Sequence, residues 1–87
     1  MSAYFYILFS TKADRFYIGH TTQSLPERLR KHNSNHRGFT GKFQDWKIVY
    51  SEAYETKNLA YQREMQVKKW KSRKRIEQLI AGSVHPA

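Results

Sequence analysis

The sequence predicts a single α/β domain of the α+β type, in which helices flank a small three-stranded antiparallel sheet. Three stretches rich in aromatic and β-branched residues have the composition of strands, and a short polar segment separates the first two, as in a β-hairpin. The segments between and after the strands carry apolar residues at helical spacing. Because 87 residues have room for one hydrophobic core, we expect one domain over residues 1–82 and a disordered tail over residues 83–87.

The predicted hairpin joins a strand over residues 4–9 to a strand over residues 15–19 through the turn-forming residues 10–14. Side chains alternate between the two faces of a sheet, and residues opposite each other share a face. Tyr6 and Tyr17 therefore point to the same face if the loop holds an even number of residues.

A capping box predicts where the first helix begins. The Ser24 hydroxyl is placed to accept the Glu27 amide N–H while Glu27 reaches back, and Pro26 is tolerated in the first turn. Arg28 lies at the margin of an apolar stripe. The stripe comprises Leu25, Leu29, His32 and His36. Glycines and polar residues over positions 33–45 predict that this helix ends there and that a mobile basic loop follows.

The C-terminal half predicts a third strand over residues 47–54 and then a helix that either Thr56 or Asn58 caps. Glu64 borders the face of this helix that we expect to be buried. That face comprises Leu59, Ala60, Val67 and Trp70. Ser72 can cap a last helix, which Gly82 should end in a left-handed conformation. This last helix carries the apolar residues Ile76, Leu79 and Ile80.

The charge balance points to a polyanionic partner. Sixteen Lys and Arg residues against seven Asp and Glu residues give a net charge of +9, which favours nucleic acid, whereas a ribosomal or membrane-surface protein is the alternative. There is no cysteine, which excludes disulfides and thiolate metal sites and fits a cytoplasmic protein. The longest apolar run, residues 4–9, is far shorter than the ~20 residues that span a bilayer, so we expect no membrane segment.

Four features in a fixed order resemble the GIY-YIG nuclease superfamily, and in particular its small stand-alone bacterial members. They are Tyr4-Phe5-Tyr6, Tyr17-Ile18-Gly19, Arg28 on the next helix, and Glu64 within LAYQREMQVKKW. The resemblance implies a three-stranded sheet with flanking helices and metal-dependent hydrolysis of DNA phosphodiester bonds. It also implies that Tyr6, Tyr17 and Arg28 are catalytic and that Glu64 is the metal ligand. Tyr4 stands where relatives often have glycine, and His20 stands where many have lysine or a small residue.

The implied chemistry suits these residue types. A phosphodiester under attack gathers negative charge, which the Arg28 guanidinium and a metal ion at Glu64 would stabilise. One carboxylate suits Mg²⁺, with Mn²⁺ as the alternative. A phenol has an ordinary pKa of about 10, so Tyr6 or Tyr17 can take a proton from water only where nearby positive charge lowers that pKa. His20 is the competing general base, because an imidazole accepts protons near neutral pH.

Further residues are expected to contact nucleic acid. They are Gly19, His32, Arg37, Lys42, Lys68 and Lys71. Several have simpler explanations: Lys68 and Glu64 have the spacing of a helix-surface ion pair, and His32 and His36 have the spacing of a zinc pair but lack an HExxH pattern. A noncatalytic nucleic-acid-binding module with the same fold is the alternative function. The chain has no space for a separate recognition domain, so specificity must come from the domain itself, a homodimer or a partner protein.

Overall fold

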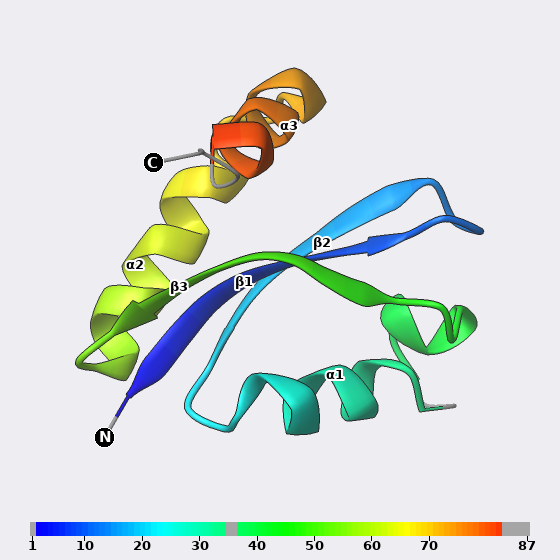
Figure 1. Ribbon diagram of the computed structural model, residues 1–87, viewed down its shortest axis with the longest axis horizontal. Helices are drawn as coiled ribbons and strands as arrows, with labels where there is room; N and C mark the ends of the chain where they lie inside the picture. Colours follow the sequence, from blue (N-terminus) through cyan, green and yellow to red (C-terminus); the bar gives the residue numbers. More distant parts are fainter. Residues whose placement is uncertain (1, 35–36, 83–87) are drawn as a thin grey trace.

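The computed structural model describes residues 2–34 and 37–82 and confirms the α+β class (Figure 1). Its single sheet is antiparallel, with the strand order β2-β1-β3. The strands are β1 (Ala3–Ser10), β2 (Arg15–Thr21) and β3 (Lys47–Tyr54). The hairpin is therefore formed as predicted, with the central strand β1 between β2 at one edge and β3 at the other.

The register of the hairpin answers the question of which way the two tyrosines face. Ser10 pairs with Arg15, so the loop holds residues 11–14, an even number. Tyr17 stands opposite Leu8, which is two residues along β1 from Tyr6. Tyr6 and Tyr17 therefore share a face, and their rings lie 6.5 Å apart.

The helices cover both faces of the sheet (Figure 1). They are α1 (Leu25–His32), the short 3-10 helix η1 (Thr40–Lys42), α2 (Lys57–Lys68) and α3 (Arg73–Gly82). In Figure 1, α1 and η1 lie on one side of the strands and α2 and α3 on the other. None of the described helices is long and apolar enough to cross a bilayer.

Each face of the sheet has its own hydrophobic cluster. On the α1 side the buried members are Tyr6, Leu8 and Trp46. On the α2 and α3 side they are Phe5, Ile7, Val67 and Ile76. Because successive residues of β1 alternate between these two clusters, this central strand is buried on both faces and fixes the position of everything packed on it.

The helix starts agree with the predicted caps, with one difference. Ser24 accepts the Glu27 amide N–H at 3.3 Å, and Thr56 rather than Asn58 caps α2. The Glu27 carboxylate does not reach back to the cap, because Arg30 one turn later binds it. The first helix therefore begins with the Ser24 half of the predicted capping box.

The buried face of α2 differs from the prediction. Leu59 is 44% exposed, and the buried line runs through Ala60, Glu64 and Val67. These three residues follow the spacing i, i+4, i+7 of one helix face, and Leu59 lies about 100° round the helix from that line. Glu64 thus lies within the buried face, although the sequence placed it at the border.

Two other expectations change in the structure. Gly82 is the last residue of α3 and has no left-handed backbone, so its predicted role as a left-handed helix end is wrong. Part of the loop expected to be mobile is packed in place: Thr40 is buried, and its carbonyl accepts the indole N–H of Trp46 at 2.9 Å. His36 and the predicted tail over residues 83–87 lie outside the described residues.

Candidate active site

The Tyr6 ring lies across the glycine of the edge strand β2. An ideal Cβ placed on Gly19 would come within 2.7 Å of the Tyr6 hydroxyl oxygen and 3.1 Å of the Tyr17 ring. A side chain at this position would thus displace Tyr6, which is 1% exposed. Because Gly19 has no side chain, the Tyr6 hydroxyl can lie over β2 at this position. Gly19 is itself buried, which argues against the nucleic-acid contact expected of it.

The Tyr6 hydroxyl belongs to a chain of hydrogen bonds that runs into the protein. Arg28 Nε donates to the Tyr6 Oη at 3.2 Å, and the same oxygen lies 2.7 Å from His32 Nε2. His32 Nδ1 lies 2.9 Å from Thr40 Oγ1. If His32 is neutral with its proton on Nδ1, the Tyr6 hydroxyl donates to Nε2 and Nδ1–H donates to Thr40; with the proton on Nε2, His32 donates to Tyr6 instead. This chain fixes the position of Tyr6.

Burial controls the ionisation of Tyr6. Removal from water raises the pKa of this phenol, and the hydrogen bond and positive charge of Arg28 offset that effect only in part. A neutral Tyr6 is therefore the stable form. The lowered pKa that a tyrosine base would need is absent in the protein alone.

The ring of Tyr17 packs beside this chain. It lies 4.7 Å from the His32 ring and 6.4 Å from the ring of Trp46. Tyr17 is half-buried, whereas Tyr6 is fully buried. Of the two tyrosines on this face, Tyr17 is thus the one with surface available to a ligand.

Glu64 approaches from the opposite face of the sheet. His20 stands opposite Phe5 and shares its face, on the side that α2 covers. The Glu64 carboxylate lies 2.7 Å from His20 Nδ1 through one oxygen and 2.7 Å from Lys68 Nζ through the other. The side chain of Glu64 is only 10% exposed, so this is a partly desolvated acidic group with a histidine and a lysine as partners.

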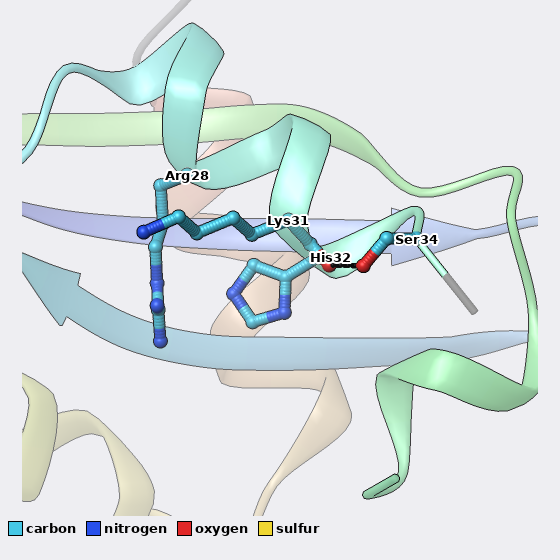
Figure 2. Close-up of a pocket in the computed structure, with 4 residues that line it drawn as sticks. All are labelled: Arg28, Lys31, His32 and Ser34. Atoms are coloured by element: carbon cyan, nitrogen blue, oxygen red, sulfur yellow. Dashed lines mark hydrogen bonds between the residues drawn. The ribbon is translucent and has the colours of Figure 1, made fainter. Parts of the chain in front are cut away.

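The two halves of the site meet around the edge strand β2. The negative charge of Glu64 lies close enough to contribute to the raised pKa of Tyr6, as the positive charge of Arg28 contributes to lowering it. Arg28 and Lys31 line a hollow of about 400 Å³ on α1, where Figure 2 shows the Arg28 side chain extending from the helix toward the sheet. Arg28 thus contacts the Tyr6 hydroxyl directly, whereas Glu64, which is held by His20 on the α2 side of the sheet, acts on Tyr6 through its charge.

The residues predicted to contact nucleic acid fall into exposed and buried groups. Lys68 and Lys71 line a hollow of about 270 Å³ beside Tyr17. Arg37 and Lys42 are exposed on the segment between α1 and β3. His32 is 5% exposed with both ring nitrogens hydrogen-bonded, so the structure favours a packed residue that holds Tyr6.

Three residues of the site were not singled out from the sequence. Lys31 lines the hollow of Arg28, Thr40 binds His32, and Tyr61 places its ring 5.2 Å from that of His20 while 45% exposed. Tyr61 precedes Glu64 by three residues, so helical spacing could have found it. The sequence contains no signal for Thr40, because its contact depends on how the loop folds.

The acidic residues bear on which metal ion the site suits. Among residues 2–34 and 37–82, no three His, Asp or Glu side chains come together as a metal cluster. Glu64 is the carboxylate whose charge acts on Tyr6, and each of its oxygens has a nitrogen partner. A single carboxylate fits Mg²⁺ or Mn²⁺, since Mg²⁺ is usually bound through one or two carboxylates together with water and substrate phosphate, and it does not fit a four-ligand zinc cage.

Comparison with known proteins agrees with this geometry. Residues 2–77 match the family model of the GIY-YIG catalytic domain. The chain is similar to a UPF0213 protein of Bacillus halodurans, whose structure was solved by NMR in solution, with 28% sequence identity and a TM-score of 0.59. The alignment covers 99% of this chain and 89% of that one. A search of curated proteins finds no match.

Proposed function

The chain belongs to the GIY-YIG family of nucleases, and from this membership we propose that it is a metal-dependent endonuclease that hydrolyses phosphodiester bonds of DNA. The observation that carries the proposal is that Arg28 donates to Tyr6 on one face of the edge strand β2 while the buried carboxylate of Glu64 contacts His20 on the other. A noncatalytic binding module needs a basic surface but has no need for a buried carboxylate next to it. The intact set of Tyr6, Tyr17, Arg28 and Glu64 therefore favours the enzyme.

The surroundings of each residue of the site support a role for it. Arg28 is placed to stabilise negative charge on the non-bridging oxygens of a phosphate at the mouth of its hollow, with Lys31 beside it. Glu64 would hold the divalent ion, which when bound neutralises phosphate charge and makes a coordinated water more acidic. His32 holds the Tyr6 hydroxyl in position.

Two groups compete for the proton of the attacking water. Tyr6 has a raised pKa and is neutral, so it can act as a base only if it first transfers its proton, for which His32 is the hydrogen-bonded neighbour. His20 is oriented by Glu64 through Nδ1, the arrangement of a general base with a carboxylate that positions it. His20→Ala and Tyr6→Phe separate the alternatives, since loss of the base should lower the rate by about 10²–10⁴ with DNA affinity nearly unchanged.

The test of the proposed function is cleavage of flapped, branched, single-stranded and duplex DNA with Mg²⁺, with Mn²⁺ and with EDTA. We expect cleavage of at least one substrate with metal and none with EDTA. We also expect binding that weakens steeply with salt, because a +9 domain releases counterions from DNA. Binding to DNA with no cleavage of any substrate would establish the noncatalytic module instead.

A further inference from the structure

Lys68 occupies an oxygen atom of the carboxylate proposed to hold the metal. Its Nζ lies 2.7 Å from Glu64 Oε2, while His20 Nδ1 takes Oε1. A Glu–Lys pair at i, i+4 on a helix surface is ordinary, but this one is asymmetric, because the side chain of Lys68 is 46% exposed and that of Glu64 is 10% exposed. The buried carboxylate is fixed, and the lysine is the partner that can move.

Lys68 also lies beside a second place that suits its charge. With Lys71 it lines the hollow of about 270 Å³ next to Tyr17. A backbone phosphate in that hollow would meet two ammonium groups, and a lysine binds phosphate well as a mobile point charge. The same ammonium can therefore pair with Glu64 or with DNA.

We propose that Lys68 competes with the metal ion for Glu64 and releases the carboxylate when a DNA phosphate draws the lysine into the hollow beside Tyr17. The proposal rests on the proposed function, in which Glu64 is the metal ligand. Metal and DNA then bind cooperatively, because each removes the obstacle to the other, and the coupling is the same in both directions. The metal site would be completed only on DNA.

The metal arm of the test compares Lys68→Met with Lys71→Met. Both changes remove one positive charge near the same hollow, but only the first removes a partner of Glu64. In Mn²⁺ titrations without DNA, followed by calorimetry, we expect Lys68→Met to bind Mn²⁺ roughly 3- to 10-fold more tightly than the wild type. Lys71→Met should stay within about twofold. Equal affinity of wild type and Lys68→Met for Mn²⁺ would overturn the proposal.

The DNA arm measures the coupling itself with a noncleavable DNA analogue that keeps both non-bridging phosphate oxygens. Saturating DNA should raise the Mn²⁺ affinity of the wild type by a larger factor than that of Lys68→Met, in which the competitor is already gone. The same rise in both proteins would contradict the exchange of partners. Glu64→Gln tests the metal ligand separately from its competitor Lys68. If Glu64→Gln binds Mn²⁺ as tightly as the wild type, then Glu64 is not the metal ligand and the proposal about Lys68 fails with it.

Discussion

Two carboxylates of this protein lie close to helix α2, and they are held in opposite ways. Glu52 on β3 accepts from Tyr50 Oη at 2.5 Å, from Tyr54 Oη at 2.6 Å and from two nitrogens of Arg63 at 3.0 and 3.2 Å. Burial raises the pKa of the Glu52 carboxyl, but these hydrogen bonds outweigh burial and lower it overall. Glu64 has one nitrogen partner on each oxygen.

The difference lies in what each partner is free to do. Arg63 donates two hydrogen bonds to Glu52, and its guanidinium also lies over the rings of Phe5 and Trp70, each at 5.7 Å, so several contacts hold it in place. Glu64 has a single contact to His20 on one oxygen and a single contact to the exposed Lys68 on the other. A saturated carboxylate stabilises the fold, whereas a carboxylate with exchangeable partners is available for chemistry.

The largest expected effect comes from removing each negative charge in turn. Glu64→Gln should lower the cleavage rate by about 10³-fold or more, because the proposed metal ligand is lost, with a small change in stability. Glu52→Gln should leave the cleavage rate of the folded protein unchanged and lower the free energy of unfolding by about 1–3 kcal/mol, since its charged hydrogen bonds weaken. Cleavage assays and urea unfolding of both variants measure the contrast.

Loss of cleavage in a fully stable Glu52→Gln protein, or normal cleavage by Glu64→Gln, would contradict this division of roles between the two carboxylates. Circular dichroism before each assay ensures that rates are compared among folded proteins. DNA binding by Glu64→Gln should equal or exceed that of the wild type, because a negative charge near phosphate is gone.

The two arginines give the second contrast. Arg28→Lys keeps the charge but loses the planar guanidinium that donates to Tyr6, and we expect the cleavage rate to fall by about 10²–10³. Arg63→Lys loses the two-fold grip on Glu52, and we expect a loss of about 1–3 kcal/mol in the free energy of unfolding at an unchanged rate. Loss of stability without loss of rate in Arg28→Lys would show that Arg28 supports the fold only.

Two glycines test how closely the site is fitted. In Gly19→Ala the new Cβ would meet the Tyr6 hydroxyl oxygen at 2.7 Å, so Tyr6 must shift and its hydrogen bond from Arg28 is disturbed. A displacement of about 1 Å in a positioned group lowers rates by about 10². Gly82→Ala is the matched control, because nothing lies within 4 Å of its Cβ and alanine favours a helix by up to about 1 kcal/mol. A Gly19→Ala protein with wild-type activity would argue against a fixed Tyr6.

Much of the framework was predictable from local patterns. Alternation along the first two strands put Tyr6 and Tyr17 on one face on condition of an even loop, which the structure has, and the sequence offered Ser24 and either Thr56 or Asn58 as the helix starts, of which Ser24 and Thr56 are the caps. These features depend on neighbours close in sequence. Residue patterns over a few positions were enough to propose them.

The contacts that define the site were less predictable, because they join distant residues. Glu64 meets His20 across 44 positions, and helical periodicity alone could not distinguish a carboxylate inside the buried face from one at its border. Leu59 shows the converse error, since an apolar side chain was assigned to the core and is exposed. The cluster around Glu52 was missed for the same reason: Arg63 reaches it from a different element.

The smallest expected effect concerns the alkaline stability of the Glu52 cluster. Burial and the hydrogen bond to Glu52 raise the pKa of Tyr54 to about 12, from about 10 in an unfolded chain. The folded protein therefore holds this proton more tightly than the unfolded chain does, so the stabilisation is complete below pH ~10 and is lost as pH rises toward 12. Thermal unfolding should show a melting temperature that falls over this range, and the melting temperature of Tyr54→Phe should fall less steeply with pH.

Tyr6, on the other face of the sheet, also has a raised pKa. The alkaline slope of the melting temperature in Tyr6→Phe is therefore the matched comparison for Tyr54→Phe. If Tyr54→Phe had the same alkaline slope as the wild type, then the Tyr54 hydroxyl would not be held by Glu52, and the distinction between a saturated carboxylate and an exchangeable one would lose one of its supports.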